Sequence, residues 1–305
     1  MMLVLLYGAL FLVGLFVLVR SSDAFVDYAK ELSLSFGVSP FVVGITIVSV
    51  GTSLPELVTS VIAVTGGSSD LVLGNVMGSN IANVFFIGGI GALIAGRLRT
   101  KENLMAVDLP FFVGTALLLG LIIMDATVSL FEGILLCVCL ILYVVYAASK
   151  KRAAKEHRTR FSWVSIFGVL LSGVLIYFSA QLSVQSIVRV GELVGIATSV
   201  LGASVVALGT SFPELFVTIA AARKNETDIV LGNILGSNIF NILGVVGIPR
   251  LFGALAVSPL MLTIVLPIMI TATLLFFVMV QERELSKWEG MFLLLLYVFF
   301  LSAIF

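Results

Sequence analysis

Long apolar runs constrain this chain more than any other feature of its sequence. A helix needs about 20 mostly apolar residues to cross a bilayer. Ten segments meet that requirement, at approximately 2–19, 41–64, 70–96, 104–124, 127–148, 162–182, 195–222, 228–253, 259–280 and 287–305. Of the 305 residues, 60% are apolar and 11% are charged, whereas soluble domains carry about 25% charged residues. The sequence therefore predicts an all-α polytopic membrane protein with ten transmembrane helices.

The remaining composition excludes several classes of partner. The formal net charge is zero, and the basic residues form no folded basic face of the kind that binds nucleic acid. Cys137 and Cys139 lie two residues apart in an apolar run, a spacing that fits neither a zinc site nor a disulfide framework. We expect contact with membrane lipid, no cofactor and no obligate protein partner.

Lys and Arg residues predict the orientation, because cytoplasmic loops carry an excess of them. With the N-terminus outside, fifteen of the 17 Lys and Arg residues fall in inner loops, and only Arg189 and Arg250 fall in outer ones. We therefore expect a multi-pass protein of the cell membrane (plasma or inner membrane) with both termini outside. The basic segment 149–161 becomes a short cytoplasmic loop in the middle of the chain.

The two halves of the chain repeat each other. Residues 42–90 align with 200–248 without a gap, and 22 of these 49 positions are identical. The halves, 1–148 and 162–305, each hold five expected spans. Because five is odd, equivalent helices cross the membrane in opposite directions. Inverted repeats of this kind are characteristic of secondary transporters, whose substrate sites lie near the membrane midplane.

Each copy carries two polar motifs. The first copy reads Gly-Thr-Ser-Leu-Pro-Glu at 51–56 and Gly-Asn-Val-Met-Gly-Ser-Asn-Ile-Ala-Asn at 74–83. The second reads Gly-Thr-Ser-Phe-Pro-Glu at 209–214 and Gly-Asn-Ile-Leu-Gly-Ser-Asn-Ile-Phe-Asn at 232–241. Each proline removes a backbone donor inside its span, so we expect broken helices, kinked or locally unwound, that free carbonyl oxygens.

Glu56 and Glu214 are the only ionisable residues deep within the expected spans. A lone carboxylate there costs on the order of 3 kcal/mol. Two of them at equivalent positions indicate a shared, compensated site. A purely structural polar pair is the alternative, and the oxygen-rich surroundings disfavour it.

The candidate ligands around this pair supply oxygen atoms. Side chains four residues apart share a helix face, and this spacing joins Thr to Glu and Ser to Asn in both copies: Thr52, Glu56, Ser79 and Asn83, with Thr210, Glu214, Ser237 and Asn241. Freed carbonyls are expected near Ser49, Thr52, Ala207 and Thr210. Such hard ligands suit Ca²⁺, Na⁺ or Mg²⁺ rather than zinc or copper.

Charge and coordination narrow the choice of ion. Two carboxylates neutralise one divalent cation, and Ca²⁺ takes about 6–8 oxygens in flexible geometry. Mg²⁺ gives up its water reluctantly and prefers fewer protein ligands. Several Na⁺ could use the same oxygens, so the two ions would compete, which is a physical basis for exchange.

The paired motifs resemble the two α-repeats of the cation/Ca²⁺ exchanger superfamily, most closely its prokaryotic Na⁺/Ca²⁺ exchanger branch. The resemblance covers nearly the whole chain. It implies an electrogenic antiporter that works by alternating access, with the first and sixth spans sliding against the rest. It implies a Ca²⁺ site between Glu56 and Glu214, with backbone help from Thr52 and Thr210. It also implies flanking Na⁺ sites that use Ser53, Ser79, Ser211, Ser237 and the carbonyls of Ser49 and Ala207.

One departure from the family pattern concerns the last residue of each long motif. Related archaeal exchangers pair an Asn at the position of Asn83 with an Asp at that of Asn241, and K⁺-dependent members resemble that Asp. Both are Asn here, which argues against K⁺ co-transport. The proton/Ca²⁺ branch typically carries a Gly-Asn-Ala-x-Glu type of motif, which this chain lacks.

Alternatives from other classes stay open at this point. An H⁺/Ca²⁺ antiporter is the nearest one. A cation channel usually builds its acidic ring from oligomeric symmetry rather than from an internal inverted repeat. An enzyme acting on phosphate would need an intramembrane Arg or Lys.

The other polar and small residues of the long motifs have less specific interpretations. The pairs Gly74/Gly78 and Gly232/Gly236 are predicted to pack helices closely. Asn75 and Asn233 are equally compatible with bracing the helices and with binding ions. The residues that follow the two serines, Asn80 and Asn238, are expected to pack away from the site.

Overall fold

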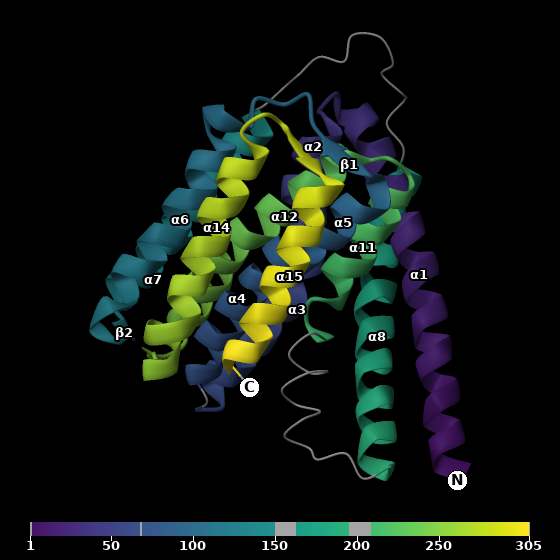
Figure 1. Cartoon of the computed structure of the whole chain (residues 1–305), viewed down its shortest axis with the longest axis horizontal. Helices are drawn as coiled ribbons and strands as arrows, with labels where there is room; N and C mark the ends of the chain where they lie inside the picture. The colour runs from purple at the N-terminus through teal and green to yellow at the C-terminus, as the bar shows by residue number, and fades with distance from the viewer. Residues whose placement is uncertain (1, 68, 150–162, 195–208, 305) are drawn as a thin grey trace.

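The computed structural model describes residues 2–67, 69–149, 163–194 and 209–304, most of them helical (Figure 1). Within these residues nine segments are long and apolar enough to cross a membrane: Met2–Phe36, Pro40–Thr65, Leu71–Ala95, Asp108–Asp125, Leu130–Ser149, Trp163–Leu193, Thr227–Arg250, Met261–Val280 and Lys287–Ile304. The expected span 195–222 begins outside the described residues. Its second part is helical. The predicted basic loop also lies outside them, except for Ser149.

Labels with η mark π-helical turns (η1, η2, η6 and η7) and 3-10 turns (η3 and η4). The first half contains α1 (Met2–Phe36), α2 (Pro40–Val43), η1 (Gly44–Val48), α3 (Ser49–Thr65), α4 (Asp70–Ile81), η2 (Ala82–Ile87), α5 (Gly88–Ala95), η3 (Leu104–Ala106), α6 (Asp108–Ile122), η4 (Ile123–Asp125) and α7 (Leu130–Ser149). The second contains α8 (Trp163–Leu193), α11 (Phe212–Arg223), α12 (Thr227–Phe240), η6 (Asn241–Val246), α13 (Gly247–Arg250), η7 (Met261–Val265), α14 (Leu266–Val280) and α15 (Lys287–Ile304).

Helices α1 and α8 are much longer than the expected spans 2–19 and 162–182. The expected first span was too short because charged residues follow it. The helix continues because Arg20 and Asp27 are exposed, whereas Ser22 and Phe25 on another side of the same helix are buried. Lys30, assigned to a loop by the sequence, is therefore also helical.

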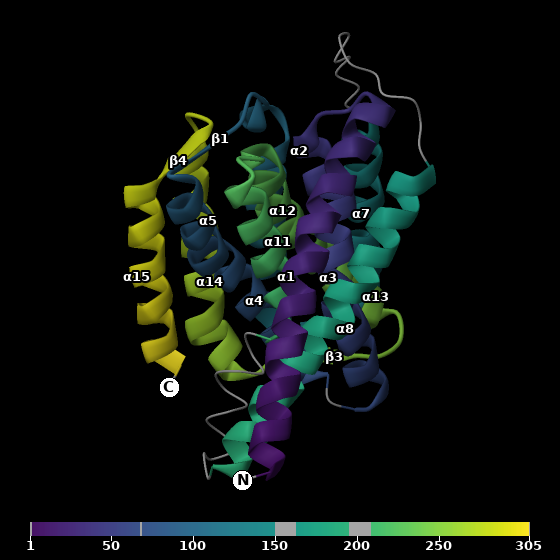
Figure 2. The ribbon, with the colours of Figure 1, turned by 90° about the vertical axis from the view of Figure 1, so that its right-hand side faces the viewer.

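The two long helices run side by side along one flank of the molecule (Figure 2). They approach closely at small residues. A Cβ atom added at Gly14 would lie 2.5 Å from Ser183 Oγ, and one added at Gly168 would collide with the ring of Tyr28. This tight contact makes α1 and α8 a packed pair.

Two short antiparallel strand pairs lie at opposite ends of the helices. β1 (Arg97–Arg99) pairs with β4 (Glu284–Ser286) at the end opposite the two termini (Figure 1). Arg99 Nε donates to Glu284 Oε2 at 2.8 Å, and this bond lowers the pKa of the Glu284 carboxyl. β2 (Thr127–Val128) pairs with β3 (Leu255–Ala256) at the other end.

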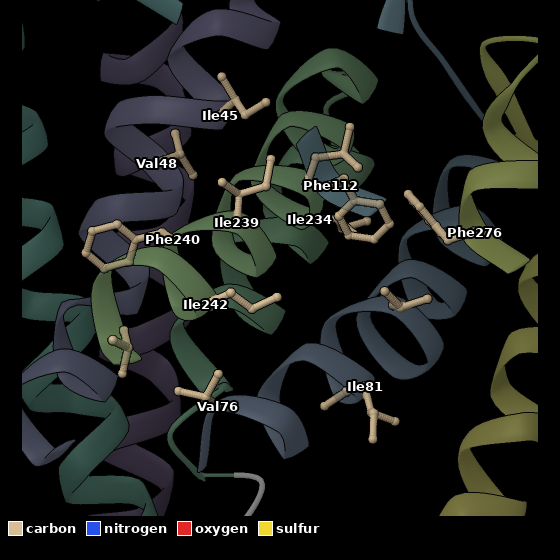
Figure 3. Close-up of a cluster of buried hydrophobic side chains, with 14 of the residues drawn as sticks. Ile45, Val48, Val76, Ile81, Phe112, Ile234, Ile239, Phe240, Ile242 and Phe276 are labelled. Atoms are coloured by element: carbon tan, nitrogen blue, oxygen red, sulfur yellow. The ribbon is translucent and has the colours of Figure 1, made fainter. Parts of the chain in front are cut away.

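Helix α12 forms the centre of the molecule, and every residue of the segment 229–240 is buried. Figure 3 shows apolar side chains of α12 and of η6, which follows it, beside residues from both halves of the chain: Ile45, Val48, Val76, Ile81, Phe112, Ile234, Ile239, Phe240, Ile242 and Phe276. The polar residues of this central segment, Asn233, Ser237 and Asn238, are equally buried, and so is Asn241, which follows it. They therefore lie out of reach of both water and lipid.

The close packing predicted for the motif glycines is present in the second copy. A Cβ atom at Gly232 would lie 2.6 Å from the carbonyl oxygen of Phe41, and one at Gly236 would lie 2.6 Å from that of Ile45. Among the described residues, the atom nearest to such a Cβ at Gly74 is Met261 Cε at 3.6 Å, and none lies within 4 Å at Gly78. The prediction is thus confirmed for α12, whereas the residues equivalent to Phe41 and Ile45 that would test it for α4, Ser199 and Ala203, lie outside the described residues.

This difference predicts unequal effects of equivalent substitutions. Gly232→Ala forces a Cβ atom against backbone that cannot move aside, and overpacking of this kind costs about 1–3 kcal/mol. Among the described residues, an alanine at position 74 meets only the flexible side chain of Met261. Gly74→Ala should therefore leave the free energy of unfolding within about 1 kcal/mol of the parent, because alanine also favours the helix. Denaturant unfolding of both variants in detergent measures the difference, and equal destabilisation would contradict the packing described here.

Candidate cation site

The backbone has different conformations in the two proline-containing motifs. In the first copy the segment Pro40–Thr65 stays helical through Pro55, and the irregularity is the π-helical turn η1 just before α3. Of the two outcomes expected at Pro55, a kink or local unwinding, unwinding is therefore not present. In the second copy Thr210 and Ser211 form a turn, and α11 begins at Phe212 with Pro213 in its first turn. The expected break is present there, because proline is tolerated in the first turn of a helix.

Glu56 on α3 and Glu214 on α11 are 0% and 1% exposed. Ser53 Oγ donates a 2.8 Å hydrogen bond to Glu214 Oε1, which links the two repeats directly. Within the described part of the chain, neither oxygen of Glu56 nor Oε2 of Glu214 has a hydrogen-bond partner. Three of the four carboxylate oxygens are therefore buried without a hydrogen-bond donor from the described residues.

Two threonine–asparagine contacts surround the carboxylates with near-symmetry. Thr52 Oγ1 donates to Asn233 Oδ1 at 3.4 Å, and Thr210 Oγ1 donates to Asn75 Oδ1 at the same distance. Asn233 Nδ2 also donates to Thr218 Oγ1 at 3.2 Å and to the Glu214 carbonyl at 3.5 Å. Asn75 and Asn233 thus each contact a threonine of the opposite repeat, which agrees with the bracing interpretation.

The candidate serines lie around the same centre. Ser211 Oγ donates to Ser79 Oγ at 3.4 Å, again between repeats. Ser237 Oγ donates to Asn233 Oδ1 at 3.4 Å. The carbonyl of Ser49 accepts a 3.2 Å bond from Thr52 Oγ1. Ala207, the last residue expected to supply a carbonyl oxygen as a cation ligand, lies outside the described residues.

Asn83 and Asn241 lie in the π-helical turns η2 and η6, at equivalent positions. Asn241 Nδ2 donates to Asn80 Oδ1 at 3.2 Å, and Asn80 Nδ2 donates to the carbonyl of Asn238 at 3.3 Å. Asn80 and Asn238 therefore meet at the repeat interface, contrary to the expectation that they pack elsewhere. In the described chain both amide atoms of Asn83, and Oδ1 of Asn241, have no partner.

Sequence reasoning missed Thr218 and Ser60, which occupy equivalent positions four residues after the glutamates. Thr218 holds Asn233, and Ser60 is buried with no hydrogen-bond partner among the described residues. The gap-free alignment of the repeats contained this signal, because both positions are hydroxyl residues in otherwise apolar helix segments.

A cavity of about 400 Å³ reaches polar residues of the site from one side. Its lining comes from α3, α4 and the turn before α11, and includes Thr59, Ser60, Ala63, Asn75, Gly78, Ser79 and Thr210. The connection between α3 and α4 lies at the end of the molecule where the termini lie (Figure 1). At the equivalent positions of the second repeat, Val217, Thr218, Ala221 and Ser237 are all 0% exposed. Among the described residues, the site is thus open toward one end and closed toward the other.

The chemistry of the site follows from its donor atoms. Two carboxylates, several hydroxyls and two amide oxygens converge in an interior where unpaired charge is costly. These are hard oxygen donors, which match alkali and alkaline-earth cations.

Comparison with known proteins gives the same architecture. A family model described as sodium/calcium exchanger protein matches residues 6–148 and 164–305. The sodium/calcium exchanger MaX1 of Methanosarcina acetivorans is 33% identical, over 96% of this chain and 97% of its own length. The inner membrane protein YrbG of Escherichia coli is 30% identical, over 95% and 94%.

A solved structure of the sodium-calcium exchanger NCX_Mj, soaked with 2.5 mM Na⁺ and 10 mM Sr²⁺, superposes with a TM-score of 0.88 at 30% sequence identity. The match covers 98% of this chain and 99% of that one. The family model matches both halves of the chain, and the relatives are matched over nearly its whole length. This multi-pass membrane protein therefore belongs to the sodium/calcium exchanger protein family.

Proposed function

We propose that this protein is a secondary antiporter that exchanges Na⁺ for Ca²⁺ by alternating access at a site between Glu56 and Glu214. It acts as a transporter rather than an enzyme, and the two ions are its substrates. The two inverted repeats are 1–148 and 162–305, joined by the basic segment 149–161. Family membership and the relatives named sodium/calcium exchangers support this assignment.

The observation that carries the proposal is a symmetric set of unpartnered oxygens. In the described chain Glu56, Glu214, Asn83 and Asn241 each keep at least one buried oxygen without a hydrogen-bond donor. Leaving a buried polar atom unsatisfied costs about 1–3 kcal/mol, and more for a charged one. A cation bound among these oxygens would remove that cost at all four positions together.

Charge balance favours one Ca²⁺ at the centre. Two carboxylates neutralise its two charges, and the carbonyls of Thr52 and Thr210 add ligands toward the usual 6–8. Na⁺ ions would use the hydroxyls around this centre, supplied by Ser53, Ser79, Ser211 and Ser237, with the carbonyls of Ser49 and Ala207. Each Na⁺ would also use one of the two carboxylates, so binding of Na⁺ opposes binding of Ca²⁺.

Orientation and charge movement complete the proposal. The basic strand β1 lies at the end opposite the termini (Figure 1), so the positive-inside rule places the termini outside the cell membrane. The present cavity then faces outward. More Na⁺ charge than Ca²⁺ charge crosses per cycle, which makes the exchange electrogenic.

The first prediction concerns the driving ion. In proteoliposomes an outward Na⁺ gradient alone should drive ⁴⁵Ca²⁺ uptake, because Na⁺ released from the site frees the carboxylates for Ca²⁺. Outward K⁺ and H⁺ gradients of equal size are the controls. Equal uptake on an H⁺ gradient without Na⁺ would replace the proposal with H⁺/Ca²⁺ antiport.

The same vesicles test electrogenicity. One net charge crossing the whole field is worth about 2.3 kcal/mol per 100 mV. Uptake should therefore change when a K⁺ diffusion potential is imposed with valinomycin. Uptake that ignores the potential would mean an electroneutral cycle.

The second prediction concerns the carboxylates. Glu56→Gln and Glu214→Gln keep the side-chain shape but leave one Ca²⁺ charge uncompensated. Breaking a buried charge pair costs about 3 kcal/mol or more, which is about a hundredfold in affinity. Both variants should lose Ca²⁺ exchange while remaining folded and extractable. Glu282→Gln, at an exposed carboxylate outside the site, is the matched control. Near-normal Ca²⁺ affinity in either site variant would disprove a shared site.

A further inference from the structure

Hydrogen bonds around the site break the symmetry of the repeats in a systematic way. Ser53 is bonded to Glu214, whereas the equivalent bond from Ser211 to Glu56 is not formed. Ser211 contacts Ser79 instead. Glu214 therefore has a serine donor from the other repeat, whereas the equivalent glutamate, Glu56, has none among the described residues.

The same pattern holds for the bracing asparagines. Thr218 Oγ1 accepts a 3.2 Å bond from Asn233. The equivalent pair is Ser60 and Asn75, and Ser60 Oγ has no partner in the part of the chain that the structure describes. The bonded pair lies on the closed side, and the unbonded pair lines the cavity.

The side-chain amides of Asn83 and Asn241, in the two π-helical turns, show the same asymmetry between repeats. Asn241 Nδ2 donates to Asn80 Oδ1 at 3.2 Å. The equivalent bond would run from Asn83 Nδ2 to Asn238 Oδ1, and within the described residues both of these buried atoms are unpartnered. The Asn238 amide turns back to the carbonyl of Ile234 in its own helix, at 2.7 Å.

These three absent bonds account for half of the unpartnered polar atoms at the site. The equivalent bonds would satisfy one oxygen of Glu56, Oγ of Ser60, Nδ2 of Asn83 and Oδ1 of Asn238. What remains is one oxygen on each glutamate and one on each π-turn asparagine, the symmetric set assigned above to the cation. The site thus divides into atoms that bind ions and atoms that change partners.

From this division we infer that Asn80, Asn238, Ser60 and Thr218 are positioning residues that hold the two repeats alternately. In the present state Asn80 holds Asn241 and Thr218 holds Asn233. In the state open to the other end, Asn238 holds Asn83 and Ser60 holds Asn75, while the first two bonds open. The inference rests on the proposed antiport for the existence of two oppositely open states.

The physical basis is that the hydrogen bonds broken in one repeat are matched by equivalent bonds formed in the other. In transporters built from inverted repeats, one bundle moves against the other around a fixed site; the family resemblance implies that the first and sixth spans move against the rest. In the opposite state each repeat then takes up the environment that the other has in the present state. The bonds lost then equal the bonds gained in number and kind. Two states of similar free energy result, and small differences in ion binding can shift their populations.

Each positioning residue should therefore bias the equilibrium in its own direction. The net worth of one hydrogen bond, about 1 kcal/mol, corresponds to about a fivefold change in the ratio of the two states. Asn80→Ala removes two bonds of the present state that join the repeats, those with Asn241 Nδ2 and with the Asn238 carbonyl. Asn238→Ala removes no such side-chain bond in the present state, only the bond of Asn238 Nδ2 to the Ile234 carbonyl within its own helix, and it removes the bond to Asn83 inferred for the opposite state. The repeat makes these two substitutions a matched pair.

Thiol accessibility can read the two states in proteoliposomes. In a Cys137→Ser/Cys139→Ser background, a cysteine introduced by Ala63→Cys reports the present cavity, because Ala63 is half-buried and lines it. Ala221→Cys reports the opposite side, where Ala221 is now 0% exposed. An impermeant maleimide is added to the corresponding side at fixed Na⁺, and labelling rates are compared.

Opposite shifts are the expected result. Asn80→Ala should slow labelling at position 63 and speed it at position 221 by about fivefold, and Asn238→Ala should do the reverse. The double variant should return toward the parent, which a purely structural loss of packing would not do. Shifts in the same direction, or no shift in either variant, overturn the inference.

A second pair of variants, at Thr218 and Ser60, tests the same inference if the asparagine variants fail to fold. Thr218→Val should act like Asn80→Ala, and Ser60→Ala like Asn238→Ala, on the same two reporters. ⁴⁵Ca²⁺ exchange by the unsubstituted protein is measured separately. A parent that labels normally but does not exchange Na⁺ for Ca²⁺ disproves the proposed function, while the labelling comparison still decides the positioning roles.

Discussion

The burial of two carboxylates inside a membrane protein is the constraint on which the rest of this structure depends. An uncompensated charge at that depth is costly, so the surrounding helices must supply either neutralising ligands or a cation. Glu56 and Glu214 come from opposite repeats and are almost completely buried. Ser53 binds one of them directly, and the other keeps both oxygens free of donors among the described residues. The fold thus creates a charge that a transported ion can balance.

Packing around the carboxylates decides which end of the molecule reaches them. The glycines of α12 bring its backbone against η1 and the start of α3, which closes one side. Among the described residues, the equivalent glycines of α4 make no such contact, and a cavity of about 400 Å³ occupies that side. On the closed side the polar residues Thr218, Asn233 and Ser237 are fully buried. The described residues thus surround the site differently toward its two ends.

Much of this organisation could be predicted from the sequence. Apolar run length predicts nearly all the spans, and the gap-free repeat predicts which residues are equivalent. What escaped prediction depends on tertiary contacts. The length of α1 was underestimated because Arg20 and Asp27 resemble loop residues until their exposed position on the helix is known. The interactions of Asn80 and Asn238 could not be predicted, because they arise at the interface between repeats, where side-chain direction depends on the π-helical turns beside them.

The central claim is that the two glutamates and their neighbouring oxygens form one site where Ca²⁺ and Na⁺ compete. Equilibrium binding of ⁴⁵Ca²⁺ to the purified protein in detergent, titrated with Na⁺ and separately with K⁺, tests it most directly. The account predicts one Ca²⁺ per chain, displaced by Na⁺ more steeply than a single-site curve because more than one Na⁺ replaces each Ca²⁺, and not displaced by K⁺. Ca²⁺ binding that is unaffected by Na⁺ would contradict it.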